Sequence, residues 1–152
     1  MGSLGEVDIQ LKAGQYAAAI ETAGLVLGDG RTKPPEVCWR AHALRAHAAL
    51  LQPDVTAAVR DIRALLQILP EWNSPPRETI QSLLILADGI GPEPMIRLIE
   101  ASPAKVFLLP VTTALQWELG RRPRVPLEVE EVAKDIASDL AGLRGATSAD
   151  AA

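Results

Sequence analysis

Two histidines and one cysteine are the side chains of this sequence most readily drawn into chemistry. His42 and His47 lie five residues apart in a segment expected to be helical. That spacing sets them about 140° apart around the helix axis, so they cannot hold one metal ion as a pair four residues apart can. Cys38 lies at the start of the same segment without an evident base to activate it. We therefore expect no metal site and no cofactor, and interpret all three as ordinary, partly buried or partly exposed residues.

The carboxylates show no arrangement suited to acid and base catalysis. Glu128, Glu131 and Asp135 lie on one face of a strongly helical segment, which is typical of a solvated surface. Nothing in the sequence fixes two of them across a cleft. The glycine-rich pieces also lack the lysine and hydroxyl that follow a phosphate-binding loop. We therefore predict no catalytic residues and a protein that is not an enzyme; a small hydrolase is the least favoured hypothesis.

A small basic cluster, Arg121, Arg122 and Arg124, precedes this last helical segment. One interpretation is a solvated loop whose arginines also stabilise the end of the preceding helix through its dipole. The other is an anchor for an acidic peptide or a phosphate, because guanidinium groups form strong paired hydrogen bonds with such anions. The sequence leaves both open.

The three tryptophans divide in a similar way. Trp39 and Trp117 fall on apolar stripes and are expected in the core. Trp72 lies in a loop between Pro70 and Pro75, so we expect it to be exposed and available at an interface.

Composition narrows the class of protein further. Hydrophobic residues make up 48% of the 152 residues and aromatic residues 3%, so the core must be aliphatic. Alanine and leucine favour helices. The net charge of −4 argues against nucleic acid as a partner, and the lone Cys38 fits a reducing, cytoplasmic compartment. Neither a secretory signal nor a membrane-spanning run is evident.

Apolar periodicity and turn residues predict an all-α fold of about seven or eight helices. A tight turn follows Lys12, Pro35 suits the first turn of a helix, and Asp54 is placed to cap another. Pro110 is expected to kink a helix over 104–119, or to follow a short extended piece. We predict one helical domain over residues 1–144 and a flexible tail over 145–152, with antiparallel hairpins at about 4–28, 36–69, 75–101 and 103–144.

The turns of the first three hairpins recur at a fixed spacing. Gln15, Asp54 and Glu93 are each 39 residues apart. A period of this size is typical of arrays in which each helical pair buries its apolar face against the next.

The first two hairpins resemble the tetratricopeptide repeat. The run from Leu11 to Ile20 matches the turn and second helix of that family, and a similar set recurs at Trp39, Ala43, Ala46, Leu50, Ala58, Val59 and Pro70. The likeness is clearest over residues 4–70 and extends more weakly to 102. It implies a right-handed α-solenoid of stacked hairpins, used as a scaffold for protein–protein interaction.

Such an array leaves a small concave groove that accepts a peptide or an amphipathic helix of a partner protein. The candidate groove residues, together with the exposed tryptophan, are Arg40, Ala41, Leu44, Ala48, Leu51 and Trp72. The last amphipathic helix of the chain is an alternative occupant of the groove.

The second half of the chain carries another resemblance. The segments 98–103 and 129–136 are similar to helical tails that follow repeats in large bacterial signalling proteins. This implies an alternative function as an oligomerisation or regulatory domain of a larger bacterial protein, with a homodimer as one possible form.

Overall fold

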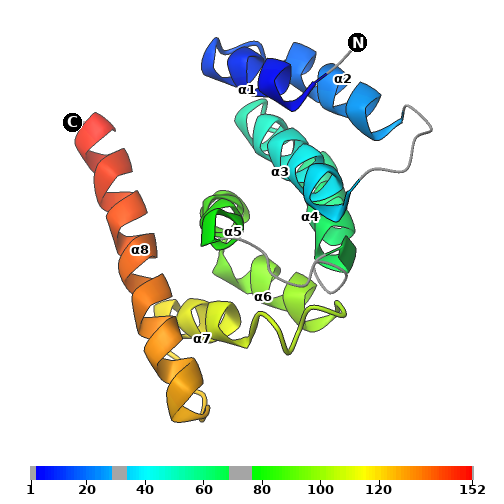
Figure 1. Cartoon of the computed structure of the whole chain (residues 1–152). Coiled ribbons are helices and arrows are strands. Elements are labelled where there is room, and N and C mark those ends of the chain that lie inside the picture. The colour runs from blue at the N-terminus through cyan, green and yellow to red at the C-terminus, as the bar shows by residue number, and fades with distance from the viewer. Residues whose placement is uncertain (1–2, 29–33, 69–76, 152) are drawn as a thin grey trace. The chain divides into compact units, whose positions relative to one another are not determined.

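Every regular element of the described structure is an α-helix. The computed structural model describes residues 3–28, 34–68 and 77–151, without the side chains of 77 and 144–151. In these ranges there are eight helices and no strand, which confirms the predicted all-α class (Figure 1). The helices are α1 (Leu4–Lys12), α2 (Tyr16–Leu27), α3 (Pro35–Leu51), α4 (Val55–Ile68), α5 (Arg77–Ile90), α6 (Pro92–Glu100), α7 (Leu109–Glu118) and α8 (Leu127–Ala151).

The chain divides into two compact units, where the sequence predicted a single domain over residues 1–144. The first unit spans residues 1–76 and contains α1 to α4. The second spans residues 77–152 and contains α5 to α8. Within the described residues, no helix is both long and apolar enough to cross a membrane.

The helices of the first unit begin where capping chemistry predicts. The Asp54 carboxylate accepts a hydrogen bond from the Ala57 amide at 3.1 Å, and Pro35 opens α3. Helices α2 and α4 start at Tyr16 and Val55, which keeps the predicted spacing of 39 residues between the first two turns. Helix α6 starts at Pro92, so the third turn lies slightly earlier than the repeat predicts.

The turn between α1 and α2 depends on a glycine. Gly14 has a φ of 78°, and its amide donates to the Leu11 carbonyl, while the Gln15 amide donates to the Gln10 carbonyl. This pair of bonds is the Schellman arrangement that ends helices in a left-handed residue. It reverses the chain within three residues and makes α1 and α2 a hairpin.

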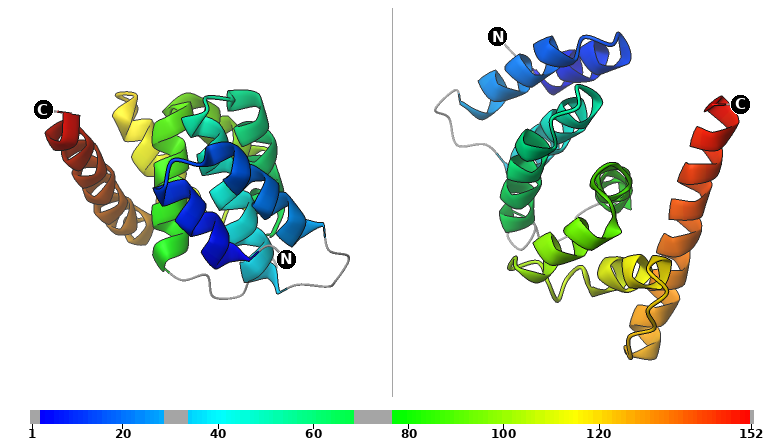
Figure 2. Two further views of the ribbon diagram at one scale, coloured as in Figure 1. Left: turned by 90° about the horizontal axis from the view of Figure 1, so that it is seen from above. Right: turned by 180° about the vertical axis from the view of Figure 1, so that it is seen from behind.

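Small side chains let the two hairpins of the first unit pack closely. Val7 of α1, Ala19 and Ala23 of α2, and Ala48 of α3 form a fully buried cluster. Leu11, Tyr16, Ile20 and Leu44 pack against it. Because Ala48 belongs to this cluster, α3 is in contact with the first hairpin as well as with α4, its partner in the second hairpin. Figure 2 shows α1 and α2 lying side by side in both views.

The sequence predicts a buried apolar stripe on the segment of α4, at Val55, Ala58, Val59, Ile62, Leu65, Leu66 and Leu69. Ala58, Ile62, Leu65 and Leu66 are buried as predicted, and Val59 is partly buried. Val55, the first residue of the helix, is 52% exposed. The predicted member Leu69 lies outside the described residues.

The second unit corrects the prediction of a helix over 104–119. Residues 101–108 form a series of turns, and α7 begins only at Leu109. Pro110 thus lies in the first turn of α7, where its missing amide hydrogen costs nothing, and it kinks no helix. The sequence also predicts that this helix is buried, because it is apolar all round. That prediction is wrong at its start, since Val106 is 83% and Phe107 is 47% exposed.

The last helix is longer than predicted. Helix α8 runs to Ala151, whereas the sequence predicted a last hairpin that ends at about residue 144 and a flexible tail over 145–152. Several alanines in the final segment favour helix continuation. The sequence predicts an apolar stripe on this helix at Val129, Val132, Ala133, Ile136, Leu140 and Leu143. Ala133, Ile136 and Leu140 are buried as predicted, whereas Val132 is 48% exposed. Helix α7 packs against the N-terminal half of α8 (Figures 1 and 2).

Candidate functional site

The structure separates the residues predicted to line a groove on α3. Arg40 and Leu51 are exposed, Leu51 by 44%. Ala41 and Ala48 are fully buried, and Leu44 packs against the cluster that holds α1 and α2 to α3. The predicted groove therefore does not form as one surface: Ala48 and Leu44 belong to the contact between the hairpins, because the first hairpin covers this face of α3.

The tryptophans also take different environments. Trp39 is 1% exposed and lies in the core, as predicted. Trp117 was expected in the core too, but it is half-buried and lines an open pocket. Trp72 lies outside the described residues, so its exposure stays a prediction.

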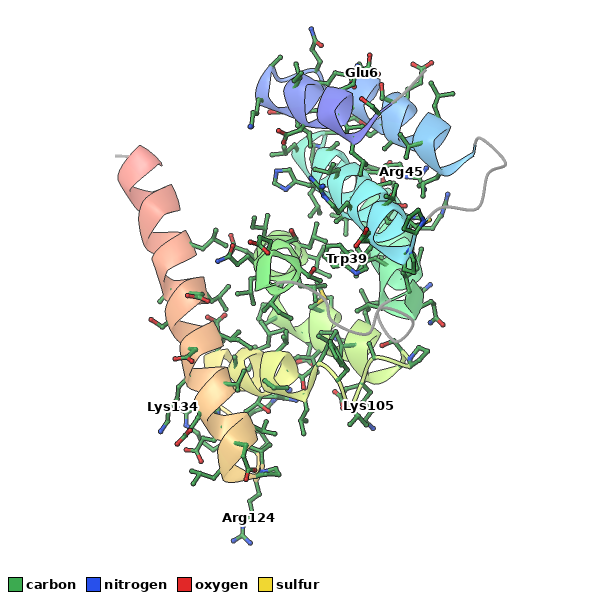
Figure 3. The ribbon with its side chains drawn as sticks, in the orientation of Figure 1. Glu6, Trp39, Arg45, Lys105, Arg124 and Lys134 are labelled. Atoms are coloured by element: carbon green, nitrogen blue, oxygen red, sulfur yellow. The ribbon has the colours of Figure 1, made fainter. Side chains whose placement is uncertain are left out.

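A charged cluster joins α3 and α4 inside the first unit. The Arg45 guanidinium donates to both carboxylate oxygens of Asp61, from Nη2 to Oδ1 at 2.7 Å and from Nε to Oδ2 at 2.9 Å. His42 Nδ1 lies 2.9 Å from Oδ1. Only 5% of the Asp61 side chain is exposed, against 28% for Arg45. Figure 3 labels Arg45 and Trp39 on α3.

The Asp61 carboxylate is held in its charged form. Burial alone would raise the pKa of Asp61, but the hydrogen bonds and charges of His42 and Arg45 outweigh it and lower the pKa below the ordinary value. An ionised carboxylate only accepts hydrogen bonds, so His42 Nδ1 carries the hydrogen that it shares with Asp61. With both oxygens of Asp61 engaged and no nucleophile on His42 in the described contacts, we interpret this cluster as structural.

Cys38 and His47, the remaining residues that could take part in chemistry, do not form a site together with other described residues. Cys38 is a free, partly buried thiol. Burial lowers the pKa of His47, which favours its neutral form. In the part of the chain that the structure describes, no three His, Cys, Asp or Glu side chains are grouped so that they could hold a metal ion.

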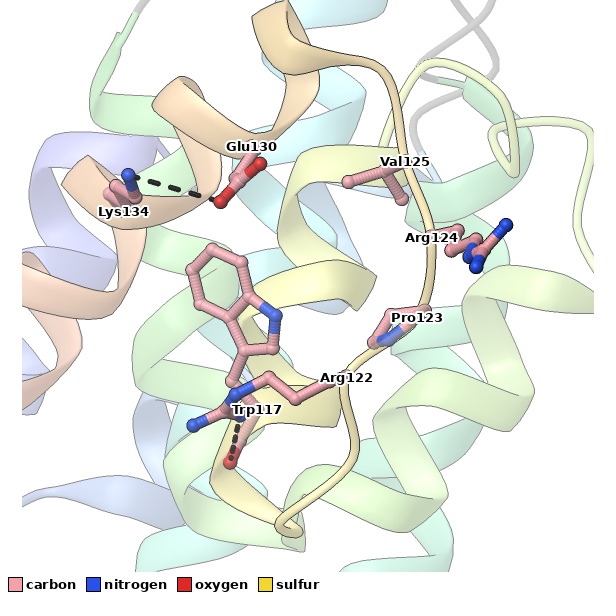
Figure 4. A pocket seen from close by; sticks show the side chains of 7 residues that line it. All are labelled: Trp117, Arg122, Pro123, Arg124, Val125, Glu130 and Lys134. Carbon is pink, nitrogen blue, oxygen red and sulfur yellow. Dashed lines mark hydrogen bonds and ion pairs between the residues drawn. The ribbon is translucent and has the colours of Figure 1, made fainter.

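The second unit contains an open pocket of about 580 Å³ at the junction of α7 and α8. Trp117 comes from the last turn of α7, residues 122–125 come from the connecting loop, and Glu130 and Lys134 come from α8. We call this the Trp117 pocket. Figure 4 shows the indole between the Glu130 and Lys134 side chains on one side and Arg122 on the other.

A second glycine-dependent helix end positions the loop of the Trp117 pocket. Gly120 has a φ of 78°, its amide donates to the Trp117 carbonyl, and the Arg121 amide donates to the Gln116 carbonyl, each at 3.0 Å. This is again the Schellman arrangement. It turns the chain sharply after α7 and brings the following arginines back beside the indole.

The three arginines of the predicted basic cluster have different roles. Arg121 forms an ion pair with Glu93 of α6 at 3.0 Å and donates to the Gln116 side chain at 2.9 Å. Arg122 lies over the Trp117 ring, 5.9 Å from its centroid, and donates to the Trp117 carbonyl at 3.3 Å. The guanidinium of Arg124 extends away from the indole, on the outer side of the loop (Figure 4). Thus Arg121 anchors the loop, while Arg122 forms a wall of the pocket.

Positive charge dominates the Trp117 pocket. Its lining includes Arg122, Arg124 and Lys134 against one carboxylate, Glu130. Lys134 and Glu130 form a loose ion pair at 3.9 Å, with side chains 65% and 42% exposed. An indole beside a guanidinium offers a flat apolar face, and the cations offer hydrogen bonds to an anion. The pocket is therefore suited to an anionic group carried next to an apolar one.

The sequence alone indicates only part of the Asp61 cluster and of the Trp117 pocket. The arginine cluster is recognisable, including its alternative as an anchor for an acidic peptide, but the four-residue spacing of Glu130 and Lys134 predicts only a favourable ion pair along one helix. Asp61 was missed, although one signal marks it: it lies three residues after Ala58 and four before Leu65, on the buried stripe of α4. A carboxylate on such a stripe indicates a buried partner.

No protein-family model matches the chain, and neither a curated protein nor a solved structure matches it.

Proposed function

We propose that the protein is a non-enzymatic interaction module that binds an acidic segment of a partner protein at the Trp117 pocket. The main support is the meeting of one indole with the cationic groups of Arg122 and Lys134 in a chain whose net charge is −4. A local positive site on an acidic protein attracts anions selectively to that place.

An acidic peptide suits this pocket better than a nucleic acid does. Binding of a single strand relies on a basic path that follows many phosphates and on several aromatic side chains that stack with bases. The Trp117 pocket offers one indole, and the Glu130 carboxylate lies among its cations. A peptide that alternates acidic and apolar side chains matches both the cations and the apolar face of the indole.

We further propose that the helical hairpins of the first unit form the scaffold of the module. Helices α1 to α4 contact one another in chain order, which supports the resemblance to stacked tetratricopeptide hairpins. Arg40 and Leu51 remain candidates for contact with a partner peptide or amphipathic helix, because both are exposed. A cytoplasmic location accords with the single cysteine.

Self-association is a second candidate function, as in an oligomerisation or regulatory domain of a larger bacterial signalling protein. The exposed Val106 and Phe107 favour it, since adjacent exposed apolar side chains often mark protein contacts. Light scattering separates the two candidates: a monomer that binds an acidic peptide supports the first, and a tight homodimer that does not bind it supports the second.

The experiment uses a fluorescein-labelled peptide of Asp, Glu and Leu residues, with a matched peptide in which Asn and Gln replace the acids. Fluorescence anisotropy should show binding of the acidic peptide alone, weakening as salt is raised. Arg122→Ala should reduce the affinity about tenfold, since it removes a charge-assisted contact. Lys105→Ala is the control, because Lys105 is exposed in the same unit but outside the pocket. Equal binding of both peptides, or equal loss in both variants, would contradict the proposal.

A further inference from the structure

Among the side chains that the structure describes, Glu130 is the single acidic one that lines the Trp117 pocket. Its Oε1 lies 3.9 Å from Lys134 Nζ, well beyond the distance of a strong charge-assisted hydrogen bond, which is about 2.8 Å. Both side chains are substantially exposed, so solvent screens the pair and it is easily broken. Figure 4 shows the carboxylate on the α8 side of the indole, directed toward Lys134.

We infer that Glu130 is a built-in competitor for the anionic ligand and thereby sets the selectivity of the pocket. The inference rests on the proposed function. The Glu130 carboxylate occupies the neighbourhood of Lys134 until an acidic side chain of the partner replaces it. No bond is made or broken in this exchange, because one carboxylate takes the place of another beside the same ammonium.

The competitor also discriminates between anions. Glu130 repels every anion that enters the pocket, and it repels a phosphate, with nearly two negative charges, more strongly than a carboxylate. Glu130 should therefore reduce the advantage that phosphorylated serine has over Asp and Glu side chains at a site where positive charge dominates. Removing the charge of Glu130 should increase this advantage.

A helix-stabilising role for Glu130 must be separated from this competition. Glu128 and Glu130 both lie in the first turn of α8, where negative charge interacts favourably with the helix dipole. Glu128 is exposed and does not line the pocket. Glu128→Gln and Glu130→Gln thus change the net charge and the dipole interaction alike, but only Glu130→Gln removes the competitor.

The test measures the fluorescence anisotropy of the labelled Asp-Glu-Leu peptide, and of a version with phosphoserine, when each is mixed with the unsubstituted protein or with either variant. Glu130→Gln should tighten binding of the acidic peptide about fivefold and of the phosphopeptide by more. Glu128→Gln should leave both affinities within about twofold of the unsubstituted protein, since an exposed charge outside the pocket is screened.

Each other outcome has a definite meaning. If Glu130→Gln binds no better than the unsubstituted protein, or if both variants gain equally, Glu130 is no competitor and the inference is overturned while the proposed function stands. If neither the protein nor either variant binds the acidic peptide, the proposed function itself fails, and the inference with it.

Discussion

Arg45 and Asp61 join α3 to α4, because the guanidinium donates hydrogen bonds to both oxygens of the carboxylate. Nη2 and Nε of Arg45 lie 2.7 and 2.9 Å from the two oxygens of a carboxylate that is 5% exposed. Gly24 of α2 lies beside the same guanidinium, since a Cβ at Gly24 would stand 3.6 Å from Arg45 Nη1. The Arg45 side chain, which comes from α3, therefore lies close to both α2 and α4.

Replacing Asp61 should destabilise the first unit strongly. Asp61→Ala leaves the Arg45 charge partly buried without its partner, which should lower the free energy of unfolding by about 3 kcal/mol. Asp8→Ala is the control, because Asp8 forms an exposed pair with Lys12 and should cost less than about 1 kcal/mol. Urea unfolding followed by circular dichroism gives both values. Similar small losses in the two variants would show that the cluster contributes little.

The partly buried His47 should make stability fall in mild acid. Its folded-state pKa is lowered from 6.5 by burial, so the unfolded chain binds a proton more readily than the folded one. The contribution is fully present above pH 6.5 and is lost as the pH falls through the folded pKa. His47→Gln should therefore lose less stability than the unsubstituted protein between pH 7.5 and about 5.5 in urea unfolding. If the free energies of unfolding of the two proteins fall in parallel as the pH is lowered, folding does not change the pKa of His47.

Leu44 and Leu51 should respond differently to the same substitution. Leu44 packs against the buried cluster of Val7 and its neighbours, so Leu44→Glu places a charge in an apolar contact and should cost about 2 kcal/mol. Leu51 is 44% exposed, and Leu51→Glu should change stability by less than about 0.5 kcal/mol. Thermal and urea unfolding measure the stability of each of the two variants. A stable Leu44→Glu would restore Leu44 as a candidate for the predicted groove.

Gly120 should be needed for both stability and binding. Alanine at a φ of 78° is strained by about 1 kcal/mol, and the strain should displace Arg122 from the indole. Gly142→Ala is the matched control in α8: nothing lies within 4 Å of the added methyl group, and the helix should gain up to about 1 kcal/mol. Melting temperatures give the stability of the two variants, and peptide affinities give their binding. An unchanged affinity in Gly120→Ala would show that the loop does not need this turn.

Local patterns predicted most of the fold. Asp54, Pro35 and Gly14 mark helix ends through their own backbone and side-chain chemistry, and the stripe of α4 from Ala58 to Leu66 follows from periodicity. The start of α7 was missed because an apolar run with Pro110 fits a kinked helix as well as a turn followed by a new helix.

The site was harder to predict because it depends on contacts that are distant in sequence. The burial of Ala48 and Leu44 follows from the packing of the first hairpin on α3, which their own segment does not encode. Likewise, Lys134 meets Trp117 only because α7 packs on α8 and Gly120 reverses the chain between them. The basic cluster can be recognised in the sequence. Its proximity to the Trp117 indole and the Glu130 carboxylate, which together form the pocket, cannot.

The most direct test of the Trp117 pocket is a titration with the Asp-Glu-Leu peptide, observed by the indole N–H resonances in ¹⁵N-labelled protein. The Trp117→Phe variant assigns the Trp117 signal by its loss. The proposed function predicts that the Trp117 resonance shifts with added peptide while that of the core residue Trp39 stays in place. Binding that leaves the Trp117 resonance unmoved, or the absence of binding, would contradict it.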